Sequence, residues 1–391
     1  MSAALGGLCD ARLTSDRRLA ELYDRKEPME GAFSSCEIAI NRETGRRHAL
    51  RVVGKTRLEM EGKAEELRAA IAAMRRLREQ PADTDTEGLH ASLLRLHEVL
   101  ASAHRVYVLY ELPDLEGAVS TDLLSLIAKE GRLKESEARR IFTKLVLAVK
   151  RAHECSVAVR NIKPDVVHVS RRTADAPWEV VLADLHYSAV ADNGQHEEGV
   201  LTGLHGTPEY AAPEVVIWYW YEIGRQLEEP PPPYGIQADA WALGICLHVM
   251  LTGCFPFDVK LAEEDMLRAV NAANFSYEDK IWAKISEDAL DLVQQLLERD
   301  PMNRPFMEEV APALWPSLNT HTYTHSFSLA LVSLVSHSLC LSPSLSLTHA
   351  THAPKRTYSL TLPCASRCLA LDPTFSLLLF PRVPKLSSML P

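Results

Sequence analysis

Gly206-Thr-Pro-Glu-Tyr-Ala-Ala-Pro-Glu214 is the most informative segment of this chain. Three more segments lie around it in a fixed order: Val159-Arg-Asn-Ile-Lys-Pro-Asp-Val166, Asp239-Ala-Trp-Ala-Leu-Gly244 and Arg299-Asp-Pro-Met-Asn-Arg-Pro305. A lone Gly, Asp or Lys in such a segment is usually a turn former or a solvated charge. Any inference about the fold therefore rests on the order and spacing of the four segments.

The composition is that of an ordinary globular protein, with 391 residues, 47% hydrophobic and 24% charged. The 42 Lys and Arg against 52 Asp and Glu leave a net charge of −10. This charge gives no electrostatic reason to expect nucleic acid or a membrane as the partner. The 8 cysteines form no C-x-x-C pair, which predicts neither a zinc site nor a disulfide framework. We expect a cytoplasmic or nuclear protein.

Residue patterns predict a strand-rich part followed by a helical part. Residues 1–20 read as a short leader, and residues 22–53 as strands with a turn at 41–45. Helices are predicted over 58–78, 134–154, 241–253 and 288–298, with a strand over 104–112. This order indicates an α+β chain in two lobes, over residues 21–111 and 114–316.

Beyond residue 316 the composition changes to Ser, Leu, Thr, His and Pro, with no charged residue from 315 to 354. Three interpretations stay open for residues 317–391. The stretch 327–347 is long enough to span a bilayer, but its serines and its proline weaken that interpretation. A disordered low-complexity tail and a tail translated from a dinucleotide repeat are both favoured over it.

The ordered segments resemble those of eukaryotic protein kinases, on the serine/threonine branch and close to the calcium/calmodulin-dependent type. The resemblance covers residues 22–316, and Lys163 and Thr207 mark the branch. It implies the two-lobe protein-kinase fold, with ATP and Mg²⁺ as cofactors. It also implies an ion pair between Glu214 and Arg304 in the large lobe.

The segment 159–166 resembles the kinase catalytic loop H-R-D-L-K-P-E-N, but it departs where the chemistry lies. Arg160 and Lys163 are retained, whereas Asn161 takes the place of the catalytic base and Val166 that of a metal ligand. An amide does not accept a proton near neutral pH, and Val does not ligate Mg²⁺. Asp184, in Asp184-Leu-His186, matches the remaining metal-binding Asp.

The expected nucleotide site is also altered. Its predicted contact residues are Gly31, Ala49, Arg51, Glu111 and Asp184. Gly31 is the one family glycine left in 29–36, and Arg51 replaces the phosphate-binding Lys. Ala70 stands where the partner Glu of that Lys is expected, with Glu66 one turn away as a substitute. Pro113 in the hinge has no N–H for adenine, and His168 lies where an apolar residue is expected.

Two further features have two interpretations each, and a third has one. Met74, Val159 and Leu185 match both a plain core and the hydrophobic stack that links kinase lobes. The run Glu228-Glu-Pro-Pro-Pro-Pro233 is interpreted as a passive surface insertion, with a rigid docking ridge as the alternative. Arg160 is a family receptor for a phosphate of the activation segment, and Thr202 is the nearest candidate acceptor.

The changes therefore fall at positions for phosphoryl transfer, while positions for packing stay apolar. This pattern is similar to that of pseudokinases, and it favours a scaffold or allosteric partner of another protein with weak or absent ATP binding. The alternative is a slow or atypical serine/threonine kinase that uses Asp184 and Lys163. A third hypothesis is a decaying gene without selected function. The sequence identifies neither the partner nor an oligomeric state.

Overall fold

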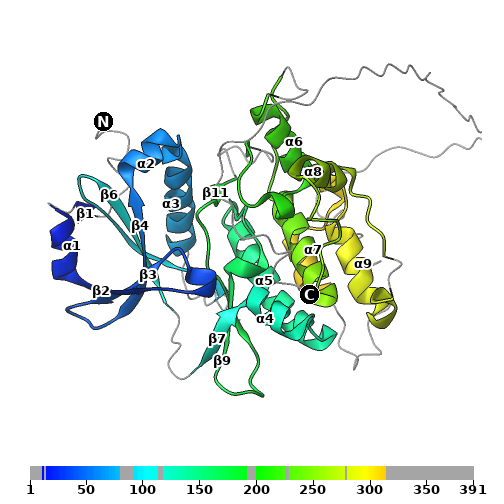
Figure 1. The fold of residues 1–391 in the computed structure, drawn as a ribbon, viewed down its shortest axis with the longest axis horizontal. Helices are drawn as coiled ribbons and strands as arrows, with labels where there is room; N and C mark the ends of the chain where they lie inside the picture. The colour runs from blue at the N-terminus through cyan, green and yellow to red at the C-terminus, as the bar shows by residue number, and fades with distance from the viewer. Residues whose placement is uncertain are drawn as a thin grey trace, which may run out of the picture. The chain divides into compact units, whose positions relative to one another are not determined.

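A computed structural model describes residues 11–12, 15–79, 92–112, 118–191, 200–224, 229–277 and 280–313. All of them belong to one of the two units into which the chain divides, and the second unit, Pro316–Lys385, contains no described residue. The described part has a sheet at its N-terminal end and a helical part after it (Figure 1). Pro113 and the tail predicted over 317–391 lie outside the described residues.

Six strands form the N-terminal sheet in the order β1-β5-β6-β4-β3-β2. The bounds are β1 (Ala11–Arg12), β2 (Tyr23–Pro28), β3 (Glu37–Asn41), β4 (Arg47–Gly54), β5 (Leu96–Ala101) and β6 (Arg105–Glu111). Only β1 is parallel to its neighbour, β5; the other described pairs are antiparallel. The predicted strands and the turn near 41–45 are confirmed.

Strand β6 shows how this sheet is covered on both faces. Val106, Val108 and Tyr110 belong to the main core, while Tyr107 and Leu109 belong to a smaller cluster on the opposite face. Successive side chains of a strand point to opposite faces, so both faces of β6 are buried. Leu19 of helix α1 (Asp16–Leu22) closes the smaller cluster, being 1% exposed. Part of the residues predicted as a leader therefore folds onto the sheet.

The helix predicted over 58–78 is instead two helices, α2 (Lys55–Met60) and α3 (Ala64–Glu79). Gly62 between them has φ +66°, a left-handed conformation that ends a helix and that glycine adopts without strain. The apolar spacing continued across the break and hid it. Helix α3 packs against the sheet at β5 and against β11 (Ala189–Val190) of the next part of the chain.

The helical part follows the hinge region. Its elements are α4 (Leu123–Glu130), α5 (Glu135–Glu154), α6 (Pro213–Glu222), α7 (Gln237–Thr252), α8 (Glu263–Ala272), α9 (Glu287–Leu296) and α10 (Met307–Ala313). Two small sheets accompany them: β7 (Val119–Asp122), β9 (Val167–Arg171) and β10 (Glu179–Leu182) in one, and β8 (Val157–Ala158) with β11 in the other. The predicted helices over 134–154, 241–253 and 288–298 are confirmed.

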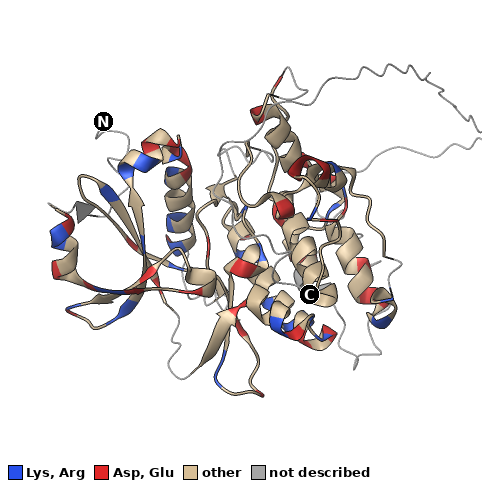
Figure 2. Cartoon of the chain, viewed as in Figure 1, with Lys and Arg blue, Asp and Glu red and all other residues tan. Residues whose placement is uncertain are grey.

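Helix α7 is the centre of the helical part and is almost without charge. Figure 2 shows it tan over nearly its whole length, whereas α3 carries both basic and acidic residues. A Cβ on Gly244 would lie 2.8 Å from Leu297 Cδ2 and 2.9 Å from Leu296 Cβ, so glycine is what lets α7 approach the end of α9. Within the described residues, no helix is both long and apolar enough to cross a bilayer.

Sheet-rich and helical parts share one hydrophobic core. Met74 of α3, Val159 and Leu185 are all buried in it, which agrees with both interpretations of these three residues. The α+β class with two lobes is therefore confirmed, with the N-terminal part extending before residue 21.

Candidate functional site

The segment 158–163 is held by one buried carboxylate. Asp239 of α7 accepts hydrogen bonds from the backbone N–H groups of Val159 and Arg160, both at 2.8 Å, and from His153 Nε2 at 2.9 Å. Asp239 is 1% exposed, so these charge-assisted bonds compensate for the cost of burying it. They fix the backbone of the two residues that precede Asn161.

Gly206 fits against the same segment. A Cβ on Gly206 would lie 2.3 Å from the Arg160 carbonyl oxygen, and Gly206 has φ +93°. Arg160 itself has φ +62°, a conformation that a non-glycine residue adopts only when its surroundings impose it. Segments 159–166 and 206–214 are thereby brought together.

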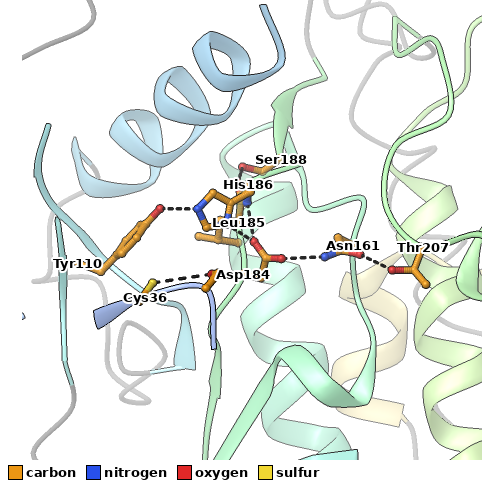
Figure 3. Close-up of polar contacts among 9 residues, drawn as sticks. Cys36, Tyr110, Asn161, Asp184, Leu185, His186, Ser188 and Thr207 are labelled. Atoms are coloured by element: carbon orange, nitrogen blue, oxygen red, sulfur yellow. Dashed lines mark hydrogen bonds and ion pairs between the residues drawn. The ribbon is translucent and has the colours of Figure 1, made fainter. Parts of the chain in front are cut away.

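A chain of hydrogen bonds runs through the site from Tyr110 to Thr207 (Figure 3). The Tyr110 hydroxyl lies 3.0 Å from His186 Nε2, and His186 Nδ1 contacts Asp184 Oδ1. Asn161 Nδ2 donates to Asp184 Oδ2 at 2.9 Å, and the Thr207 hydroxyl donates to Asn161 Oδ1 at 3.2 Å. Residues from β6, the Asp184–His186 turn and both loop segments therefore form one polar network.

The network has one consistent set of protons. Burial raises the pKa of Asp184, but His186 and Arg51 oppose it and the net shift is downward, so Asp184 is a carboxylate. Burial lowers the pKa of His186, which is therefore neutral near pH 7. Its Nδ1–H donates to Asp184, and Nε2 accepts from Tyr110, whose pKa burial raises far above its usual range.

This arrangement does not fit Mg²⁺. Asp184 Oδ1 already accepts from the His186 backbone N–H at 3.0 Å and from the His186 ring, and Oδ2 accepts from the Asn161 amide. The Asn161 N–H donor points at the Asp184 carboxylate, whereas a bound cation would need a second oxygen ligand at that place. Val166, at the expected metal-ligand position, is buried and apolar. Across the described ranges there is no cluster of three His, Cys, Asp or Glu suited to a metal.

The loop expected to bind phosphate is a closed turn. Gly31 begins the 3-10 turn η1 (Gly31–Phe33) with φ +61°. The N–H groups of Phe33, Ser34 and Cys36 donate to carbonyls within this same loop, at 3.4, 2.9 and 2.8 Å. They therefore do not point outward as phosphate donors, as the glycine-rich loop of a nucleotide site requires.

The side chain of Phe33 packs against His168, which stands where an apolar residue beneath adenine is expected. Phe33 is 2% exposed, and its ring centroid lies 5.2 Å from that of His168. His168 is buried, and its Nε2 has no hydrogen-bond partner among the described residues. A Cβ on Gly31 would lie 3.0 Å from Asp122 Oδ2 at the start of α4, so the loop rests directly on the helical part. The residues of this site do not fit a bound nucleotide in this conformation.

The remaining predicted nucleotide contacts lie on strands β4 and β6. Ala49 is fully buried in β4 opposite Tyr110. Glu111 is exposed at the end of β6, where it lies 3.6 Å from Arg95. The Arg51 guanidinium is partly buried and has no ion pair within the described residues, although its charge helps to lower the pKa of Asp184.

Glu66 does not take the place of a partner for Arg51. Its Oε2 lies 3.3 Å from Nδ1 of His205, in the segment before Gly206, while Ala70 is fully buried. The suggested compensation by Glu66 is therefore wrong. Helix α3 is tied to the 200–206 segment by His205 instead.

The two retained catalytic-loop residues also have local partners. Lys163 Nζ lies 2.9 Å from Asp165 Oδ2, and Arg160 Nε donates to the Tyr187 carbonyl at 2.5 Å. That Arg160 receives a phosphate carried by Thr202 stays a prediction: Thr202 is exposed, and Arg160 Nε is bonded to the Tyr187 carbonyl.

The predicted pair of Glu214 and Arg304 is confirmed. Two parallel bonds join the side chains, at 2.7 and 2.8 Å, and Arg304 is 2% exposed. The guanidinium also donates to the carbonyls of Glu298, Arg299 and Gln237. All three of its nitrogens are thus satisfied, as a buried charge requires.

Sequence reasoning missed Tyr110, His205 and Tyr234. Tyr110 directly precedes the hinge, and His186 replaces a family glycine nearby in space. The sequence could therefore have predicted a hydrogen bond between these two side chains. His205 and Tyr234 gave no such signal, because their partners Glu66 and Leu201 are joined to them by the fold alone.

Comparison with known proteins places these features in a family. Residues 26–315 match the protein kinase domain family. CBL-interacting serine/threonine-protein kinase 26 of Arabidopsis thaliana is 30% identical over 76% of this chain and 59% of its own length. CBL-interacting protein kinase 4 of Oryza sativa subsp. japonica is 35% identical over 72% of this chain and 54% of its own length. The chain thus spans little more than half the length of these curated relatives.

Proposed function

The chain belongs to the eukaryotic protein kinase family, in its serine/threonine branch, and on that premise we propose that it is a pseudokinase that acts through protein contacts. Members of this family use ATP and Mg²⁺. We propose that this chain binds them weakly or not at all, and that it serves as a scaffold or allosteric regulator of another protein.

The hydrogen bonding of the Asp184 carboxylate is the observation that carries the proposal. Both of its oxygens accept N–H donors from the chain itself, two from His186 and one from Asn161. Metal binding would have to break these bonds and turn the Asn161 amide away. The N–H donors supply the positive end of a dipole where family members use a cation, so the carboxylate is stable without metal.

Two other observations support weak nucleotide binding. The N–H groups of the loop after Gly31 are bonded within the loop, and Phe33 lies on His168. A nucleotide would have to open the turn and displace the Phe33 ring, and this cost is subtracted from its affinity.

Support for a protein partner comes from the relatives, which are named as CBL-interacting kinases. Part of each relative has no counterpart here, so we propose the class of partner, a protein, and not its identity. The buried pair of Glu214 and Arg304 keeps the helical part intact for such a role.

The test is a nucleotide titration on the full chain by calorimetry, with and without Mg²⁺, followed by turnover of radiolabelled ATP on generic serine/threonine substrates. We expect no heat signal at micromolar ATP and no turnover above that of the Asp184→Ala control. Robust turnover that disappears in Asp184→Ala would overturn the proposal and leave the slow or atypical kinase. That alternative is supported by the retained Asp184 and Lys163 and by the Thr207–Asn161 hydrogen bond.

A further inference from the structure

The segment 201–206 is paired with a neighbouring stretch of its own chain. Leu201 and Tyr234 form a two-bond antiparallel bridge: the Leu201 N–H donates to the Tyr234 carbonyl at 3.1 Å, and the Tyr234 N–H donates to the Leu201 carbonyl at 2.8 Å. Both side chains are buried. The backbone of Leu201 is therefore unavailable to any other strand.

The Tyr234 hydroxyl adds a third connection. It donates to the Gly203 carbonyl at 3.0 Å, two residues further along the segment. Burial raises the pKa of Tyr234, and the Arg160 guanidinium beside the hydroxyl opposes that rise. Tyr234 thereby links the segment to the catalytic-loop arginine, which also bonds the Tyr187 carbonyl.

The opposite side of the segment is held by α6 and α3. The Leu204 N–H donates to Glu222 Oε1 at 3.2 Å, and His205 pairs with Glu66. Gly203, with φ +77°, makes room for these contacts, since a Cβ there would lie 2.9 Å from Glu222 Oε1. The segment is thus bonded on both sides.

The stretch that carries Tyr234 is itself anchored. Trp218 Nε1 of α6 donates to the Pro232 carbonyl at 3.1 Å, and Pro231 is buried while Pro232 and Pro233 are exposed. Proline has little backbone freedom to lose, so a proline run holds Tyr234 in place at low entropic cost. The interpretation of residues 228–233 as a passive surface insertion stays a prediction, and the contacts of Pro231 and Pro232 show that this part of the run also packs against its own chain.

We propose that residues 230–234 are an internal brace that fixes the 201–206 segment permanently, without phosphorylation. The Tyr234 hydroxyl and backbone supply the contacts that order the segment, and Arg160 Nε is bonded to the Tyr187 carbonyl. Phosphate on the exposed Thr202 is then not needed to order it. This inference concerns the conformation of the segment and holds whether or not the site transfers phosphate.

The test is hydrogen exchange, read by mass spectrometry, on peptides that cover 201–206. Tyr234→Phe removes the hydroxyl contacts to Gly203 and Arg160 and keeps the buried ring. We expect exchange in this segment to become about fivefold faster, the change that loss of one net hydrogen bond produces. Exchange in α7 should be unchanged. The matched control is Tyr277→Phe, because Tyr277 is a half-buried tyrosine outside the brace.

Phosphatase treatment and Thr202→Ala form the second arm, and each should leave exchange in 201–206 within about twofold of the untreated chain. The brace is refuted if Tyr234→Phe leaves this exchange unchanged, or if phosphatase treatment accelerates it as much as Tyr234→Phe does. Trp218→Phe, which removes the bond to Pro232, is the substitute if Tyr234→Phe does not fold, with the same expected acceleration and the same refuting result.

Discussion

At the scale of single residues, Asn161 decides what Asp184 can do. An Asp at position 161 would place a second carboxylate where the amide N–H now lies, 2.9 Å from Asp184 Oδ2. Two carboxylates at that separation need a cation or a shared proton between them. The amide removes this need. The amide nitrogen of Asn161, in place of a carboxylate oxygen, thus lets the pair of residues 161 and 184 be stable without a cation.

Asn161→Asp is therefore expected to destabilise the metal-free chain by on the order of 2 kcal/mol at neutral pH, since it exchanges a hydrogen bond for like-charge repulsion. Millimolar Mg²⁺ should restore much of the loss. Urea unfolding with EDTA and with Mg²⁺ measures both effects.

Asn161→Leu is the control for this prediction. It removes the same N–H donor but adds no charge, so its destabilisation should not respond to Mg²⁺. Equal responses to Mg²⁺ in the Asp and Leu variants would show that the amide does not replace a cation.

Asp184 should also make stability depend on pH. Its folded-state pKa lies below the ordinary value, so the unfolded chain binds the proton first as pH falls. Its contribution is complete above about pH 5 and is lost progressively below about pH 4. Urea midpoints between about pH 5 and about pH 3 should fall less steeply for Asp184→Asn than for the wild type. Parallel curves for the two proteins would contradict the lowered pKa.

At the scale of elements, the sequence predicted most of the helices and strands but few of the hydrogen bonds that connect them. Strands and helices with regular apolar spacing, such as α5 and α7, were readable because burial imposes that spacing. The break at Gly62 was not, since apolar residues continued in phase on both sides. The closed turn after Gly31 was also hidden, because its hydrogen bonds depend on backbone angles that residue types alone do not determine.

The same reasoning explains which site residues were found. Asn161, Asp184 and the Glu214–Arg304 pair lie in segments with recognisable neighbours. Tyr234 and His205 depend on contacts between segments that are close only in the folded chain.

Gly206→Ala tests the close approach of two segments. Its Cβ would lie 2.3 Å from the Arg160 carbonyl oxygen, so strain and steric overlap together should cost about 3–5 kcal/mol. Gly45→Ala is a matched control, with φ +71° and no atom within 4 Å of the added Cβ, and should cost only about 1 kcal/mol. Chemical denaturation of both variants measures the difference. Similar losses would mean that the segments are not in contact.

Glu214→Gln tests the link between α6 and the loop before α10. The change leaves the buried Arg304 guanidinium without its carboxylate, which should cost about 3–5 kcal/mol. Glu61→Gln breaks the exposed pair with Arg57 and should leave the unfolding midpoint unchanged. A stable Glu214→Gln protein with the wild-type midpoint would contradict the importance of this link.

At the scale of the whole described unit, Phe33 joins the sheet-rich part to the helical part. Its ring packs against His168, so a ligand that binds against His168 has to displace the ring. The apparent affinity of such a ligand is reduced by the fraction of molecules in which the ring is displaced.

Phe33→Ala should therefore raise affinity for an adenine nucleotide about tenfold in Mg²⁺-free buffer, while it lowers the unfolding temperature. Phe33→Leu keeps apolar bulk at the same place and should bind as the wild type does. Calorimetry on the three proteins compares them. If Phe33→Ala binds no more tightly, the ring is not the barrier to binding.

The carboxylate of Asp239 has a consequence for how this chain could change over time. It fastens the loop through the backbone N–H groups of Val159 and Arg160 and through His153, and through no side chain that performs transfer chemistry. The atoms that hold the loop in place are thus different from the side-chain atoms that would perform phosphoryl transfer. Substitutions at Arg51, Asn161 and Val166 can therefore accumulate, or be reversed, while the hydrogen bonds of Asp239 to the loop backbone stay in place. The loss of activity proposed for this chain could therefore be reversed by a few substitutions, without any change in how the loop is held.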